Sequence, residues 1–296
     1  MPIEQNSKVK LVRREDEAFA FTVVDADTGR PLSEAEAKAR MPKQPEPKAA
    51  ARPKAGDTRA LAAAPLRLCG EGDSWINLLN PISGFPKTFF DVLGATFATV
   101  NIAFPGDTLD DVLATRQYVQ KLSSGQFRVF ILSGGGNDIL GGGGLAKLLK
   151  GKSEGHGSTD PADYVKAPQL KAALKKLRTG YRVAAKEAKT AEKSVVMLIH
   201  GYDYVIPRRN GKWLGKPLKA AGFTHDEPLA GKITGFLVDS FNELLRAVAG
   251  EFAHVRYVNV RKTVQTLWHD ELHPTTAGAK KVAKLFEAEI NRLLIS

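Results

Sequence analysis

Residues 66–75 read LRLCGEGDSW, and the change of character within this stretch decides the fold of the main part of the chain. An apolar segment, Leu66 to Cys69, breaks on two glycines and is followed at once by Asp73 and Ser74. A short strand, a glycine turn and a Ser or Asp form the usual connection from a β-strand to a helix. Two roles are therefore open for Ser74: the N-cap of a following helix, or a nucleophile at the carboxyl end of a parallel strand.

Beyond this stretch, β-branched or aromatic segments alternate with helical patterns. We expect strands near residues 66–69, 97–104, 127–133, 194–201 and 255–260. A long basic helix and a C-terminal helix at 277–294 are also predicted, the first with an apolar face of Leu170, Leu174, Leu177, Tyr181 and Ala184. The alternation predicts a parallel sheet covered on both faces by helices. The Gly-, Ser- and Lys-rich residues 141–163 predict a mobile loop.

Three segments of different composition divide the chain. Residues 1–40 are expected to form an N-terminal extension, in which AFAFTVVDADTGRPL (18–32) predicts a β-hairpin. Residues 41–65 are rich in Pro, Ala and Lys and predict a linker, because they cannot bury enough apolar surface to become ordered. We expect residues 66–296 to form the main domain.

Composition excludes several classes of protein. With 296 residues, 43% of them hydrophobic, the chain can bury one sizeable core. No apolar run approaches the roughly 18 residues of a membrane span, and the N-terminus lacks a signal pattern. We therefore expect a cytoplasmic, bacterial protein, or export by a route that the sequence hides. Cys69 is the single cysteine, which excludes an internal disulfide and a cysteine-rich metal site.

The net charge of +11 has much of its basic excess in two places, the predicted helix near 166–189 and the segment 208–219. Such a basic surface fits a solvated helix face, and it also fits an anionic substrate or polyanion. We do not expect nucleic acid as the partner. The sequence carries no indication of an oligomeric state.

A nucleophilic Ser74 requires a base, and the segment LWHDELHPTTAG (267–278) supplies one. His273 follows Asp270 by three residues, between the last predicted strand and the last helix, at the same edge of the sheet as Ser74. Such a histidine can take the serine proton, and the carboxylate can hold the imidazole Nδ1–H. NIAFPGDTLDD (101–111) and FILSGGGNDIL (130–140) add oxyanion donors, the Gly106 N–H and the Asn137 amide.

These four blocks occur in the order typical of one family. The glycine, acid and serine of GDSW (72–75), Gly106 in PGDT, Asn137 in GGND, and Asp270-x-x-His273-Pro274 resemble the SGNH, or GDSL, hydrolases over residues 66–293. The resemblance implies a three-layer α/β/α sandwich with a five-stranded parallel sheet, the flavodoxin-like SGNH fold. It further implies an acyl-serine mechanism. We expect no cofactor and no metal.

By the same resemblance, Ser74, His273 and Asp270 form the catalytic triad. The oxyanion hole is made by the Ser74 N–H, the Gly106 N–H and Asn137 Nδ2. We therefore expect an esterase or lipase-like activity on a small-molecule ester, with thioesters and acylated sugars as further candidate substrates. The usual leucine after the serine is Trp75 here, which changes the shape expected of the acyl pocket.

The segment HGYDYVIPRRNGKWLGKPL (200–218) should overhang this site. It is either a structural loop or a substrate lid, and four side chains are candidate substrate contacts: Trp75, Tyr202, Arg208 and Trp213. The pair His269 and His273 does not match a zinc-protease motif, because Asp270 stands where that motif needs Glu and Pro274 disfavours a helix. The alternative function is a non-catalytic binding protein that uses its basic surface on a hydrolase scaffold.

Overall fold

The computed structural model describes residues 9–13, 21–25, 27–33, 36–37, 40, 66–79, 84–141 and 143–295. Its centre is an all-parallel sheet of five strands in the order β4-β3-β5-β6-β7. The strands are β3 (Arg67–Gly72), β4 (Ala98–Asn101), β5 (Val129–Ser133), β6 (Val196–His200) and β7 (Val255–Val258). All five predicted strands are confirmed, and the sheet has the flavodoxin-like order, in which the first strand lies between the second and the third.

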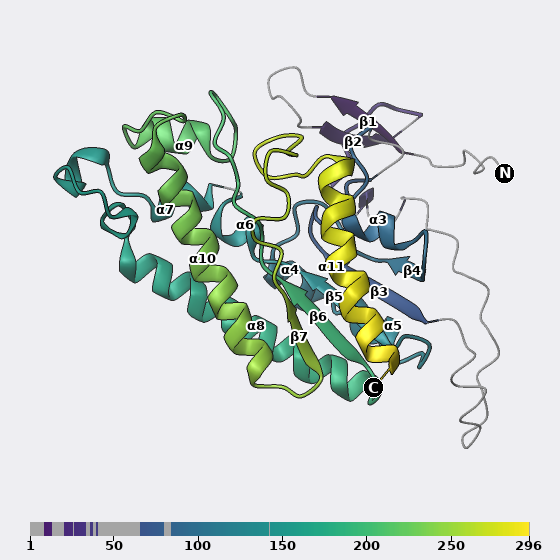
Figure 1. The fold of residues 1–296 in the computed structure, drawn as a ribbon. Helices are drawn as coiled ribbons and strands as arrows, with labels where there is room; N and C mark the ends of the chain where they lie inside the picture. Colours follow the sequence, from purple (N-terminus) through teal and green to yellow (C-terminus); the bar gives the residue numbers. More distant parts are fainter. Residues whose placement is uncertain are drawn as a thin grey trace.

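Helices cover both faces of the sheet, as the alternating pattern predicts. On one face α3 (Phe89–Leu93) packs against α11 (Thr276–Ile295). On the other face α8 (Ala167–Ala191) packs against α4 (Leu109–Thr115), α5 (Gln117–Leu122) and α10 (Pro228–Gly250). Figure 1 shows β6 and β7 between α10 and α11. This distribution follows from right-handed crossovers, because the direction of travel along the sheet reverses after β4.

The basic helix α8 buries the face that its sequence predicts. Leu170, Leu177, Tyr181 and Ala184 are buried and Leu174 is half-buried, whereas the cationic side chains point outward. Some of these cations are paired, since Arg178 and Arg182 both contact the carboxylate of Glu251. An apolar stripe with a charged outer face is the pattern of a helix that covers a sheet.

Residues 141–163 are not one long loop, and this prediction is wrong. They continue from α6 (Gly136–Ile139) into α7 (Gly144–Leu148), η1 (Lys152–Gly155) and η2 (Pro161–Tyr164). Tyr164 is fully buried, donates its hydroxyl to the Ser158 carbonyl at 2.7 Å and packs edge-on against Phe223. Helices of four or five residues are too short to show a helical repeat of hydrophobic residues in the sequence. The prediction therefore rested on the Gly-, Ser- and Lys-rich composition, which is typical of a loop.

The N-terminal extension contains an antiparallel strand pair, whose first strand lies before the segment 18–32 in which the sequence predicts a hairpin. Strands β1 (Val9–Arg13) and β2 (Phe21–Asp25) pair antiparallel. After β2, the Gly29 N–H donates to the Asp25 carbonyl at 2.9 Å, and Pro31 lies beside Val24 in an isolated bridge. The predicted linker, residues 41–65, lies outside the described residues. Within the part of the chain that the structure describes, no helix combines the length and apolarity needed to cross a membrane.

Candidate active site

Ser74 stands on a tight turn at the carboxyl end of β3. After Gly72 the chain reverses through an isolated turn, in which the N–H groups of Ile76 and Asn77 both donate to the Asp73 carbonyl, at 3.0 and 3.1 Å. Gly72 has a φ of +129°, and a Cβ there would lie 1.7 Å from the Ser133 carbonyl oxygen, so glycine is required. Because residues 73–76 form a turn and not a helix, the N-cap role for Ser74 is wrong.

The loop between β7 and α11 brings His273 to this serine. His273 Nε2 lies 2.8 Å from Ser74 Oγ, and His273 Nδ1 lies 2.7 Å from Asp270 Oδ2. The other carboxylate oxygen, Asp270 Oδ1, accepts the backbone N–H groups of Leu272 and His273, each at 2.8 Å. Asp270 therefore shapes the loop with one oxygen and orients the imidazole with the other.

The charge state of Asp270 sets the tautomer of His273. Burial raises the pKa of this carboxyl, but the hydrogen bond and charge of His273 and two backbone N–H groups outweigh burial and hold the pKa below its ordinary value. An ionised carboxylate can only accept hydrogen bonds, so the proton at that side of the ring belongs to Nδ1. In the neutral imidazole, Nε2 is then free to accept the Ser74 hydroxyl proton.

Asp73 stabilises the turn that carries Ser74 through hydrogen bonds of its carboxylate. Its carboxylate is buried and accepts the Trp75 N–H at 3.0 Å, as the sequence predicts for a turn-forming residue. It also accepts two hydroxyls, from Ser133 at 2.8 Å and from Tyr202. The Tyr202 hydroxyl in turn accepts the Gly136 N–H at 3.0 Å. Tyr202 is thus a buried support of the turn as well as part of a pocket wall.

The blocks after β4 and β5 are tied together at the same edge. Asn137 Nδ2 donates to the Asp107 carbonyl at 2.9 Å, and Asp138 accepts the Leu109 N–H at 3.1 Å. Nδ2 of Asn137 carries a second proton, which has no acceptor in the described part of the chain. Among the residues that the structure describes, none accepts a hydrogen bond from the N–H of Ser74 or of Gly106. Three potential donors therefore belong to three neighbouring strand ends.

Comparisons with solved structures agree with this architecture. A phospholipase A1 from Streptomyces albidoflavus NA297 superposes with a TM-score of 0.53 at 16% sequence identity, over 76% of this chain and 99% of that one. An extracellular lipase from Streptomyces rimosus gives a TM-score of 0.52 at 16% identity, over 75% of this chain and 99% of the other. The chain has the SGNH hydrolase fold. No family model and no curated protein sequence matches it.

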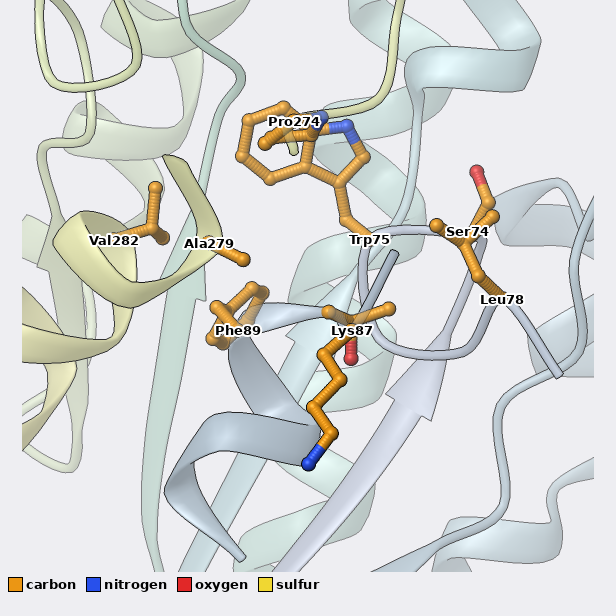
Figure 2. A pocket seen from close by; sticks show the side chains of 9 residues that line it. Ser74, Trp75, Leu78, Lys87, Phe89, Pro274, Ala279 and Val282 are labelled. Carbon is orange, nitrogen blue, oxygen red and sulfur yellow. The ribbon is translucent and has the colours of Figure 1, made fainter. Parts of the chain in front are cut away.

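Two hollows flank Ser74 in this SGNH fold, and Trp75 lines both of them. The first, of about 250 Å³ with its mouth included, is bounded by Leu78, Lys87, Thr88, Phe89, Pro274, Ala279 and Val282. Figure 2 shows Ser74 at one edge of this hollow, with Ala279 and Val282 of α11 on its far side. The second, of about 310 Å³ with its mouth included, is bounded by Asp73, Gly136, Asn137, Leu140, Tyr202, Val205 and Leu272. Both walls are mainly apolar.

Trp75 joins the serine turn to the histidine loop. Its indole N–H donates to the Leu272 carbonyl at 3.0 Å, and its ring packs against Tyr202, His200 and Trp268. Burial lowers the pKa of His200 to about 4, so this imidazole is neutral at pH 7 and belongs to the aromatic cluster. Trp75 therefore links the turn that carries Ser74 directly to the loop that carries His273.

The segment 200–218 is fastened to the same loop. The Arg208 guanidinium donates to the carbonyls of His269 and Trp268, at 2.9 and 3.0 Å. The Trp213 ring packs edge-on against His273, with 5.6 Å between ring centroids. Neither Arg208 nor Trp213 lines either of the two hollows. These contacts favour a structural loop over a lid, and substrate contact by either side chain stays a prediction.

Sequence reasoning missed two residues at this edge of the SGNH fold. Ser133 ends β5 beside Gly72, and its hydroxyl reaches Asp73. Ser133 lies at the carboxyl end of a strand next to β3, so a prediction of the strand order would have placed it near Asp73. Glu271, between Asp270 and His273, has a buried carboxylate. Nothing in the sequence distinguishes it from an exposed loop glutamate.

Proposed function

We propose that the protein is a serine hydrolase that cleaves carboxylic esters through an acyl-serine intermediate. The observation that carries this proposal is the continuous hydrogen-bonded chain from Ser74 Oγ through His273 to Asp270. A nucleophile, a base and a carboxylate that orients the base, all within hydrogen-bonding distance, form the arrangement that nucleophilic catalysis by serine requires.

In the first half of the reaction, Ser74 Oγ attacks the ester carbonyl carbon while His273 Nε2 takes the hydroxyl proton. Asp270 stabilises the imidazolium that forms. The same imidazolium then protonates the departing alcohol, which leaves Ser74 acylated. In the second half, His273 takes a proton from water, the resulting hydroxide attacks the acyl group, and Ser74 recovers its proton as the acid leaves.

The developing negative charge on the carbonyl oxygen needs donors that are already in place. We assign this role to the Ser74 N–H, the Gly106 N–H and the available Asn137 Nδ2 proton. The bond from Asn137 to the Asp107 carbonyl, at 2.9 Å, supports this assignment because it holds the amide in one orientation before substrate arrives. Donors that need no reorganisation are worth most in the transition state.

The apolar walls of the two hollows support an acyl substrate, and both hollows are small, about 250 and 310 Å³ even with their open mouths included. We therefore propose short acyl chains, with thioesters and acylated sugars as further substrates. The names of the two similar structures, a phospholipase A1 and a lipase, support the ester class.

A panel of p-nitrophenyl esters from acetyl to palmitoyl, with a thioester and an acetylated sugar, tests this proposal. We expect turnover that is greatest for the shortest chains and is lost in Ser74→Ala. The variant should keep the fold because only a hydroxyl is removed. Equal turnover in Ser74→Ala and wild type would reject the serine mechanism, and binding without turnover in both would favour the non-catalytic binding protein.

Removing one oxyanion donor gives a separate prediction. Asn137→Ala should lower kcat by roughly 10²–10³-fold, because the lost bond forms only as charge develops on the carbonyl oxygen. KM should change little, since ground-state binding does not use this bond. Asn101→Ala is a matched control. It also removes a side-chain amide that donates a hydrogen bond to a backbone carbonyl, that of Ile76 at 3.1 Å. Equal losses of kcat in both variants would mean that Asn137 is only structural.

A further inference from the structure

Glu271 lies between Asp270 and His273, yet its carboxylate points away from both and into the segment 208–215. It is only 2% exposed. Its two oxygens accept four backbone N–H groups at 2.8–3.0 Å, those of Arg208 and Gly215 on Oε1 and those of Trp213 and Leu214 on Oε2. A buried carboxylate is stable only with such a complete set of donors, so this arrangement satisfies Glu271 and holds the segment in one conformation.

The segment is shaped to fit this carboxylate closely. A Cβ at Gly211 would lie 2.0 Å from the Glu271 carboxyl carbon, so only glycine allows the backbone to pass there. The Arg208 side chain returns in the opposite direction and donates to the carbonyls of Trp268 and His269. The two segments thus hold each other through six hydrogen bonds, an arrangement that we call the Glu271–Arg208 interlock.

The interlock places one aromatic ring on the proposed base. Trp213 is the residue whose N–H donates to Glu271 Oε2 at 2.9 Å, and its ring packs edge-on against the His273 imidazole at 83°. His273 already has hydrogen bonds at both ring nitrogens. A ring packed against the imidazole restricts its remaining freedom to rotate out of those bonds.

We propose that Glu271 is a positioning residue: through the interlock it keeps Trp213 against His273 and keeps Nε2 aimed at Ser74. This inference rests on the proposed function. It assigns no chemical step to Glu271, whose carboxylate is fully occupied by backbone donors. Its effect is on the fraction of time that the imidazole spends in the reactive geometry.

The test begins with Glu271→Gln, which keeps the size of the side chain but turns amide protons toward backbone donors. Loosening of this kind should lower kcat by about 10–100-fold, the cost of a displacement on the order of 1 Å at a reacting group. KM should stay within about threefold, because no substrate contact is removed. Lys219→Gln removes an exposed charge from the neighbouring helix α9 (Gly215–Ala220) and should leave kcat unchanged.

A double-mutant cycle separates positioning from general destabilisation. If Glu271 acts through Trp213, then Glu271→Gln should cost less than about threefold in a Trp213→Ala background, because the contact it maintains is already absent. The rates are expressed per active site titrated with a fluorophosphonate, so unfolded protein does not count. Multiplicative losses, or an unchanged kcat per titrated site, would overturn the inference.

If Glu271→Gln does not fold, Arg208→Gln tests the same interlock from its exposed side, and it should show the same coupling to Trp213→Ala. Independent losses there would also overturn the inference. Failure of the proposed function has a different signature, since the wild-type protein would then lack ester turnover that depends on Ser74.

Discussion

Replacing His273 by alanine should lower kcat on model esters by roughly 10⁴–10⁶-fold, the range for removal of a triad member in serine hydrolases. The reason is the position of the ring: Nε2 is 2.8 Å from the Ser74 hydroxyl, and the described structure places no other base within hydrogen-bonding distance of that oxygen. Without it, Ser74 must attack as a neutral alcohol and the leaving alcohol must depart without a proton donor. Steady-state kinetics with p-nitrophenyl acetate measures the loss.

The matched control is His269→Ala, which removes a second imidazole from the same loop. The His269 side chain packs edge-on against Phe85 at 5.6 Å, and its backbone, which the substitution retains, makes the contacts to His273 and Arg208. We expect its kcat to stay within a few-fold of wild type, as for most changes away from the reacting atoms. Comparable losses in the two variants would mean that loop folding, and not proton transfer, explains the effect at His273.

The second large effect is expected for Asp270→Asn. We expect a loss in kcat of up to about 10⁴-fold, the size known for replacement of the triad aspartate by asparagine in a serine protease. The asparagine oxygen can still accept the N–H groups of Leu272 and His273, so the loop should fold. Its amide, however, would donate to His273 Nδ1 and move the ring proton to Nε2. That tautomer cannot accept the Ser74 hydroxyl. A kcat near wild type in a folded variant would show that Asp270 does not set the tautomer.

Asp73→Asn distinguishes the two carboxylates next to the serine. Asp73 accepts the Trp75 N–H and two hydroxyls and does not contact His273, so its replacement should reduce stability more than it reduces kcat per folded molecule. If Asp73→Asn abolished turnover in a folded protein while Asp270→Asn were neutral, the roles of the two residues would be reversed.

The low pKa of Asp270 also has a consequence for stability. A carboxyl whose pKa is lower in the folded than in the unfolded state stabilises the fold above the unfolded value, about 3.9 for Asp, and this contribution is lost as the pH falls through the folded value. Thermal unfolding should therefore show Asp270→Asn below wild type at pH 7, with a difference that shrinks below about pH 4. A difference that stayed constant would mean that Asp270 does not titrate abnormally.

The sheet was predictable because each strand is a short β-branched or aromatic run bounded by turn residues, as at 127–133 and 194–201. In a parallel sheet such runs are buried on both faces and stand out from the amphipathic helices between them. Residues 141–163 were not predictable, because single helical turns leave no period and their order depends on the buried Tyr164. The position of that ring is set by distant contacts such as Phe223.

The hydrogen-bonded chain at the site was predictable because Ser74 and the pair Asp270 and His273 lie at strand ends that a parallel sheet brings to one edge. The residues that support them were not predictable. Tyr202 looked like a substrate contact, yet its hydroxyl is bound to Asp73, a contact that depends on β6 lying two strands from β3. Glu271 and Arg208 bind backbone groups. Every residue has a backbone, so the residue types in the sequence do not show which ones these side chains bind.

In the proposed mechanism Ser74 Oγ becomes covalently bonded to the acyl group, and every other role at the site depends on that bond. Incubation with a fluorophosphonate followed by mass spectrometry of the intact protein and its peptides tests it directly. We expect one adduct per chain, located on Ser74, with activity lost in proportion to labelling and with no adduct in Ser74→Ala. An adduct on another residue, or complete labelling of Ser74 with full ester turnover remaining, would contradict the mechanism.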